Sequence, residues 1–436
     1  MKSRRPSPIF FAALAIAAIT FSLAVSAQAQ TETILYNFPS GWNGNYPDGT
    51  VVLDGSGNIF GSTQSGGQCC GAVYELSPAS GGGWTYKVLH GFSSSSYGAY
   101  VSPTLVRDSA GNLYGTTING GNLSANCNGQ GCGVVFELSP TSSGPWKETV
   151  LHTFSGGTDG ANPYGNLLLG ADGSIYGTTV RGGNNHQCTT KYIQGCGVVF
   201  KLSNGSTGWR ETVLYTFTKA VGDSPNPGLV MDAAGNLYGT TAAYGGTLFE
   251  LSPTTSGEWT ETTLINFLTT TWGYPENGLI MDAAGNIYGT TINPSGQCPI
   301  SGSCGTVFEL SPASGGGWTQ SVVHTFVAGK TDGAYPFGVS MDAAGNLFGV
   351  AIYGYSDNSH CGEDGCGVVF ELSPSAGGTW TETVLHEFQD GTDGNPNGIS
   401  GVAIDASGNV FGTAAAGGNN LTLCGNGCGV IFEITK

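Results

Sequence analysis

Short apolar runs alternate with glycine-rich and polar turns from residue 31 to the end of the chain. One unit recurs seven times, and its fullest copy contains three segments, residues 278–291, 305–312 and 318–326. Each copy holds four short runs rich in Val, Leu, Phe, Tyr and Thr, which predict four strands. The Gly-Asn step of the unit, or its equivalent, returns at intervals of 50 to 63 residues. Four strands per repeat indicate one β-propeller blade.

The two ends of the repeat array complement each other. The last copy ends at residues 430–434 without a fourth strand, whereas residues 31–38 match that missing strand. A linear solenoid would instead need atypical caps at both ends. We therefore expect an all-β, seven-bladed β-propeller with four antiparallel strands per blade, forming one domain over residues 30–436. Its N-terminal strand completes the last blade and closes the ring.

Several residue types recur at one position in most copies, and we expect them to serve the fold. The turn between the first two strands carries an Asp whose side chain suits a hydrogen-bonded hairpin. These turn residues are Asp54, Asp108, Asp172, Asp232, Asp282, Asp342 and Asp405. A Trp opens the fourth strand in six copies, at Trp84, Trp146, Trp209, Trp259, Trp318 and Trp380. Repeated acids in the third strand (Glu75, Glu137, Glu250, Glu309, Glu371, Glu433) and repeated histidines in the fourth (His90, His152, His324, His386) diverge around a ring, so they cannot converge on one substrate or metal.

Residues 1–29 have the three parts of a secretory signal peptide: a basic start, an apolar stretch and an Ala27-Gln28-Ala29 site. Their removal takes away three of 13 basic residues and none of 30 acidic residues, which leaves a net charge of −20. This balance disfavours nucleic acid and anionic membranes as partners. No second apolar run is long enough to span a bilayer. We expect a monomer without membrane insertion, secreted or periplasmic after cleavage.

Twelve cysteines fall in six close pairs, each in the loop between the second and third strands. The pairs are Cys69 and Cys70, Cys127 and Cys132, Cys188 and Cys196, Cys298 and Cys304, Cys361 and Cys366, and Cys424 and Cys428. In an exported protein this arrangement predicts local disulfides. The adjacent Cys69 and Cys70 either form a strained vicinal ring or remain a reactive dithiol. Two thiolates per loop on separate blades do not complete a zinc site, so we expect neither metal nor cofactor.

No catalytic or nucleotide-binding motif stands in a credible context. Blade-to-blade connections and cysteine loops should emerge on one face, where non-repeating aromatics suit sugars or peptides. The candidate ligand-binding residues are Trp42, Tyr46, Trp272, Tyr274, Tyr244 and Tyr353. Alternatively, aromatics beside Pro163, Pro275 and Pro336, including Tyr164, Tyr335 and Phe337, seal the blade junctions. His360, with Asp357, Glu363 and Asp364, forms either a cation site or a solvated acidic loop.

Three segments recur in order and resemble the bacterial GloVer tandem-repeat family: residues 232–241, 368–374 and 380–386. The resemblance covers residues 31–436 and implies an exported repeat protein without an assigned activity. Members often carry a C-terminal anchor, for which this sequence shows no counterpart. The Asp-x-x-Gly-Asn-x-Tyr turn is also similar to NHL-type and lactonase-like propellers, but it transfers no catalytic residue.

Three functions remain open at this point. The first hypothesis is a non-catalytic binding or scaffold propeller that recognises an extracellular carbohydrate or protein through the cysteine-loop face. The second is a lyase or hydrolase acting on extracellular polysaccharide, with acids drawn from non-repeating loop positions. The third is a structural component of the cell envelope. We favour binding over catalysis, because most of the acidic residues recur once per blade.

Overall fold

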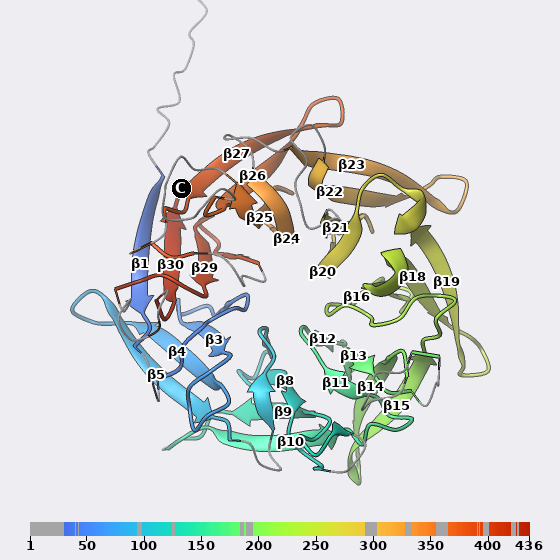
Figure 1. Ribbon diagram of the computed structural model, residues 1–436, viewed down its shortest axis with the longest axis horizontal. Helices are drawn as coiled ribbons and strands as arrows, with labels where there is room; N and C mark the ends of the chain where they lie inside the picture. Colours follow the sequence, from blue (N-terminus) through green and yellow to red (C-terminus); the bar gives the residue numbers. More distant parts are fainter. Residues whose placement is uncertain are drawn as a thin grey trace, which may run out of the picture.

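Seven antiparallel sheets surround a central axis like the blades of a propeller (Figure 1). The computed structural model describes residues 30–39, 41, 43–93, 98–123, 127–142, 144–183, 187–188, 195–292, 303–327, 333–354, 365–389, 391, 393–395, 401–419, 424 and 427–436. The first strand of each blade is innermost and the fourth is outermost. The predicted seven-bladed β-propeller is confirmed.

The first three blades are built from the N-terminal part of the chain. From the axis outward, blade 1 contains β2 (Val52–Leu53), β3 (Ile59–Thr63), β4 (Ala72–Pro78) and β5 (Trp84–Gly91). Blade 2 contains a split inner strand, β6 (Ala99–Val101) and β7 (Val106–Arg107), followed by β8 (Leu113–Asn119), β9 (Val134–Ser139) and β10 (Lys147–Thr153). Blade 3 likewise contains β11 (Ala161–Pro163) and β12 (Leu168–Leu169), then β13 (Ile175–Arg181), β14 (Val198–Gly205) and β15 (Gly208–Thr216).

The other four blades follow the same plan. Blade 4 contains β16 (Val230–Met231), β17 (Leu237–Thr241), β18 (Thr247–Pro253) and β19 (Trp259–Asn266). Blade 5 contains β20 (Tyr274–Met281), β21 (Ile287–Ile292), β22 (Ser303–Pro312) and β23 (Trp318–Val327). Blade 6 contains β24 (Gly333–Met341), β25 (Leu347–Gly354), β26 (Val368–Ser375) and β27 (Thr379–Glu387). Blade 7 contains β28 (Ala403–Ile404), β29 (Val410–Ala414), β30 (Val430–Thr435) and β1 (Thr31–Asn37). Two short 3-10 turns, η2 (Ala243–Gly245) and η3 (Phe267–Thr269), flank the junction of blades 4 and 5.

The ring closes through the two ends of the chain. Strand β1 pairs antiparallel with β30, from Thr31 opposite Thr435 to Asn37 opposite Val430. Figure 1 shows the blue N-terminal strand on the outside of the red last blade. The pairing gives both β1 and β30 the hydrogen-bonding neighbour that each would lack in an open array. The expected closure by complementary half-repeats is therefore confirmed.

The glycine of the Tyr-Gly-Thr-Thr run is fixed by packing. A Cβ on Gly239 in β17 would lie 2.6 Å from Cζ of Phe249 in β18. The same approach, at 2.3 to 2.6 Å, occurs in every blade, at Gly61, Gly115, Gly177, Gly289, Gly349 and Gly412. These glycines lie in extended strands, so the aromatic ring on the next strand, not an unusual φ, excludes a side chain there.

An aspartate side chain bonds the backbone of the turn between the first two strands in all seven blades. In blade 1, Oδ1 of Asp54 accepts hydrogen bonds from the backbone N–H groups of Ser56 and Asn58, both at 2.9 Å. In blade 3 Asp172 also bonds the turn, because its Oδ1 accepts a hydrogen bond from the backbone N–H of Ser174 at 3.0 Å, while Gly170 makes the main-chain bonds that Asp54 makes in blade 1. Asp172 lies two residues further on, where Lys201 donates to it at 3.2 Å. Lys201 replaces the glutamate of the other third strands, so the two exchanges complement each other.

The hydrophobic core consists of seven separate layers, one between each pair of neighbouring blades. Each of the six repeated Trp side chains packs against one of these layers. Trp318 of blade 5, for example, contacts Tyr238 of blade 4 edge-on, with ring centroids 5.5 Å apart. The expected packing role of these tryptophans is confirmed.

The outer strands of neighbouring blades are joined by a matched pair of side chains at the rim. His90 of blade 1 lies 3.5 Å from Glu148 of blade 2, and His324 of blade 5 lies 3.6 Å from Glu382 of blade 6. Where blade 7 meets blade 1, Tyr36 stacks on Tyr86 with centroids 4.2 Å apart. The repeated histidines therefore serve separate junctions, as expected from their repeat position.

Four cysteine pairs form the expected disulfides: Cys69–Cys70, Cys127–Cys132, Cys188–Cys196 and Cys424–Cys428. The vicinal disulfide of Cys69 and Cys70 is thus formed, and these two residues are not a free dithiol. Cys304 and Cys366 are also disulfide-bonded, while Cys298 and Cys361 lie outside the described residues. Within the described part of the chain, no helix is long and apolar enough to cross a bilayer.

Candidate binding site

The cysteine loops and the blade-to-blade connections meet on one face, which we call the cysteine-loop face. Here the carbonyl of a loop's second cysteine accepts a hydrogen bond from the next blade's connection. Tyr46 N–H donates to Cys428 at 3.0 Å, and Asn162 N–H donates to Cys132 at 2.8 Å. Both donors have positive φ, 56° and 54°, which side-chain-bearing residues rarely adopt. The disulfide loops therefore hold these two entrances to inner strands in a fixed and strained conformation.

In blades 1 to 6 the pairing of the inner strand is interrupted just after this entrance. In blade 2 the pairing with β8 is broken between β6 and β7, and in blade 3 the pairing with β13 is broken between β11 and β12. Bulges of this kind redirect side chains. The residue at the start of this interruption directly follows a proline in five of six described blades, and we call it the axial position. Its residues are Asp48, Ser102, Tyr164, Asn226, Glu276 and Phe337.

The fold itself uses two of these axial side chains. The Asn226 amide donates to Thr240 Oγ1 and to the Pro275 carbonyl of the next blade, both at 3.0 Å. Ser102 Oγ accepts from Thr116 at 2.8 Å. Both axial residues are buried, with 8 % and 0 % of their surface exposed. The other four axial residues differ in size, charge and aromaticity, so their identity does not follow from a shared structural task.

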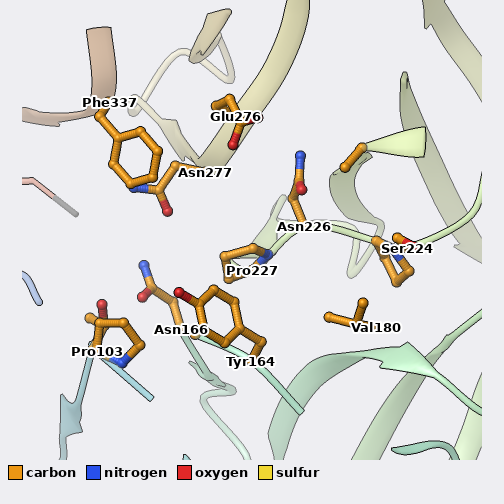
Figure 2. A pocket seen from close by; sticks show the side chains of 14 residues that line it. Pro103, Tyr164, Asn166, Val180, Ser224, Asn226, Pro227, Glu276, Asn277 and Phe337 are labelled. Carbon is orange, nitrogen blue, oxygen red and sulfur yellow. The ribbon is translucent and has the colours of Figure 1, made fainter. Parts of the chain in front are cut away.

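A hollow of about 140 Å³ lies where the axial positions of blades 3 to 6 face one another (Figure 2). Tyr164 and Phe337 contribute aromatic rings, and Glu276 contributes a carboxylate. Amide groups come from Asn166 and Asn277, and the remaining described lining residues are Pro103, Thr104, Gly165, Val180, Ser224, Pro225, Asn226, Pro227 and Ala242. Ala242 begins the shortened loop of blade 4, the repeat without cysteines, so the hollow borders the cysteine-loop face.

Two carboxyl groups act on the tyrosine of the hollow. Burial raises the pKa of Tyr164, and the negative charges of Asp48 and Glu276 raise it further. Burial also raises the pKa of Glu276. It raises the pKa of Asp48 to about 7, although the carboxylate accepts from Gln64 at 3.4 Å. The tyrosine hydroxyl therefore stays protonated, and charge at the two carboxyls is poorly solvated.

Three of the predicted ligand-binding residues pack within blade junctions. Trp272 stacks on Phe308 with ring centroids 6.0 Å apart, in the junction of blades 4 and 5, where blade 4 supplies no disulfide. Tyr353 contacts Tyr335 edge-on at 5.3 Å in the junction of blades 5 and 6. Tyr46 is half-buried, and its hydroxyl donates to the Cys424 carbonyl at 3.4 Å. Their roles in ligand binding stay predictions.

The other predicted site residues are not brought together. Tyr274 is half-buried in β20 opposite Ile292. Trp42 and the side chain of Tyr244 lie outside the described structure. The acidic loop of His360, with Asp357, Glu363 and Asp364, also lies outside the described residues. Cys188, Cys196 and Asp223 have ligand-type atoms within 4.8 Å of one another, but both sulfurs are in the disulfide, so they offer no thiolates.

The hollow contains residues that the sequence interpretation passed over, above all Asn166, Glu276 and Asn277. Tyr164 and Phe337 were expected to seal blade junctions, yet both line the hollow, and Tyr164 is 37 % exposed. Tyr335, the third of these aromatics, does seal a junction. The sequence did contain one signal for these residues. At the axial position, repeats that are otherwise strongly similar carry unrelated residues.

Solved structures share the fold at low sequence identity. A puromycin hydrolase matches with a TM-score of 0.51 and 10% identity over 86% of this chain and 50% of the hydrolase. The periplasmic gluconolactonase of Pseudomonas aeruginosa matches with a TM-score of 0.48 and 11% identity, covering 79% of this chain and 85% of that one. A gluconolactonase of Xanthomonas campestris gives a TM-score of 0.41 and 13% identity, covering 73% and 86%. These likenesses concern the fold alone.

Sequence comparison identifies the repeat itself. No curated protein sequence matches this chain. The profile of the Gloeobacter/Verrucomicrobia repeat matches residues 19–191 and 125–361, which together cover most of the sequence. The suspected resemblance is thereby confirmed, and the chain belongs to the Gloeobacter/Verrucomicrobia repeat family.

Proposed function

We propose that this protein is an exported binding propeller that takes a carbohydrate group into the axial hollow from the cysteine-loop face. The observation that carries the proposal is the lining of the hollow. Two aromatic rings, three amides and a carboxylate meet there at positions that the repeat leaves free to vary. The disulfides favour an oxidising extracellular or periplasmic location.

The chemistry of the lining suits a sugar. The rings of Tyr164 and Phe337 offer apolar surface on which the C–H face of a pyranose can pack. The amides of Asn166 and Asn277 can both donate to and accept from sugar hydroxyls. These groups come from blades 3, 5 and 6 of one propeller, and pockets of this kind are usually formed before the ligand arrives. A hollow of about 140 Å³ favours one terminal sugar residue over a long chain segment.

A glycan array followed by titration calorimetry tests this proposal. Wild type is compared with the double variant Tyr164→Ala and Phe337→Ala, and with Leu123→Ala as a control. Leu123 is 54 % exposed in the cysteine loop of blade 2 and lies outside the hollow. We expect binding by wild type and by the control, and a loss of at least tenfold in affinity in the double variant. Equal affinity in all three proteins, or no glycan bound by any, would refute the proposal.

A second candidate function, cleavage of a polysaccharide, is favoured by the acid beside the hollow. Burial places the pKa of Asp48 at about 7, the range in which a carboxyl group can donate or accept a proton at neutral pH. Glu276 is the second carboxyl acting on Tyr164. The protein would be incubated with polysaccharides that carry the glycans bound on the array. Mass spectrometry would then reveal new reducing ends or unsaturated products. Catalysis predicts that Asp48→Asn abolishes them, and their absence with wild type excludes this candidate.

A further inference from the structure

The described lining of the hollow contains a carboxyl group and no basic side chain. Glu276 belongs to the lining, and the charge of Asp48 acts on Tyr164 in the same lining. None of the described residues that line the hollow is basic. Among the described residues, none makes a hydrogen bond or an ion pair with the Glu276 carboxylate. Burial raises the pKa of this carboxyl group. A partly buried carboxylate without a counter-charge is costly, so a cation would be stabilised here.

The aromatic rings favour the same class of ligand. The faces of Tyr and Phe attract ammonium groups through their quadrupoles, by about 0.5–2 kcal/mol depending on exposure. Tyr164 stays neutral, because its pKa is raised. The carbonyl oxygens of Asn166 and Asn277 can accept hydrogen bonds from an N–H group. The whole chain carries a net charge of −17, which draws cations toward the molecule at low ionic strength.

We propose that the group bound in the axial hollow is a protonated primary amine, held by Glu276 and the faces of Tyr164 and Phe337. This inference rests on the proposed binding function and specifies its ligand class. The ammonium can belong to a deacetylated hexosamine or to a lysine side chain, since both present the same cation to the hollow. N-acetylation removes the charge from the sugar and leaves its ring unchanged, so it separates this inference from general sugar binding.

Titration calorimetry near pH 7 tests the inference with three probes: a glucosamine tetramer, an N-acetylglucosamine tetramer and Nα-acetyl-lysine amide. We expect the amine tetramer to bind at least tenfold more tightly than the acetylated tetramer. This advantage should shrink when salt is raised, because screening weakens the charge attraction. Binding of the lysine derivative alone would identify a basic peptide as the source of the amine.

Glu276→Gln keeps the shape of the side chain and removes its charge. We expect this variant to lose at least tenfold in affinity for the amine probe. The matched control, Glu258→Gln, changes the net charge equally at an exposed position between β18 and β19 that does not line the hollow, and it should bind as wild type. The salt dependence of wild type gives an independent reading that needs no variant to fold.

The outcomes separate the two proposals. Equal affinity for the amine and acetylated tetramers, or an unchanged affinity in Glu276→Gln, overturns the amine inference and leaves sugar binding in place. Failure of all three probes, together with an empty glycan array, overturns both. A strong preference for the amine with a loss in Glu276→Gln supports both.

Discussion

Replacement of Gly239 by alanine should destabilise the propeller by overpacking one blade. The new Cβ would lie 2.6 Å from Cζ of Phe249 and 2.8 Å from Cδ2 of Leu229, whereas ordinary contacts begin at 3.4 Å. The Phe249 ring must therefore retreat by about 0.8 Å in a junction core where it is 0 % exposed. Overpacking of this kind costs about 1–3 kcal/mol. The gain from alanine over glycine in a strand, about 0.5–1 kcal/mol, offsets only part of that cost.

The assay is a double-mutant cycle measured by urea unfolding. Phe249→Leu shortens the ring that blocks the new methyl group, so Gly239→Ala should cost clearly less in that background. We expect an interaction free energy of at least about 1 kcal/mol, in the range found for residues in direct contact. Gly81→Ala is the control, since a Cβ there meets nothing within 4 Å. Strictly additive effects, or equal costs at Gly239 and Gly81, would show that ring packing does not fix this glycine.

Two further predictions concern the blade junctions. Thr178→Val should lower the free energy of unfolding by about 1–3 kcal/mol, because it removes the buried hydroxyl that donates to the Asn226 carbonyl at 3.1 Å. Urea unfolding checks this prediction, with Thr212→Val at an exposed strand position as the control. Equal unfolding midpoints in the two variants would contradict it. Burial raises the pKa of Glu148 from 4.5 to about 7, so the folded protein holds a proton that the unfolded chain releases, and this contribution to stability is lost as the pH rises through 7. Glu148→Gln should therefore reduce the fall in the urea midpoint between about pH 6.5 and pH 8. Below pH 6.5 the stability also depends on His90, whose pKa is lowered by burial, and its contribution to stability rises with pH. A wild-type slope in the variant would refute the assignment.

The fold could be predicted from the repeats, because each strand has its own β-forming pattern of residues. Seven copies of the same pattern made the assignment of the strands consistent. Even the ring closure was visible, since residues 31–38 match the strand missing after residue 434. Asp172 bonds the turn of blade 3 as expected, but its shift by two residues was not visible in the sequence, because the Gly-Asn step is replaced at Ser174. Only the main-chain bonds of Gly170 reveal that shift.

The axial hollow could not be read from the sequence alone, for a geometric reason. Tyr164 and Glu276 belong to different blades and are more than 100 residues apart, and only the bulged inner strands bring them to one axis. Trp272 shows a second limit of the sequence pattern. A residue outside the repeat pattern suggested ligand binding, yet its ring fills the junction where blade 4 has no disulfide.

The rim pairs limit how such a propeller can grow by gene duplication. Each pair is divided between two repeats, so a duplicated repeat must match itself as well as its old neighbours. A second copy of blade 2 would set His152 of one copy against Glu148 of the next, which repeats the pairing of His90 with Glu148. A second copy of blade 1 would set His90 against Tyr86, whose natural partner is Tyr36. Duplication of blade 2 would therefore preserve the pairing at the rim, whereas duplication of blade 1 would not.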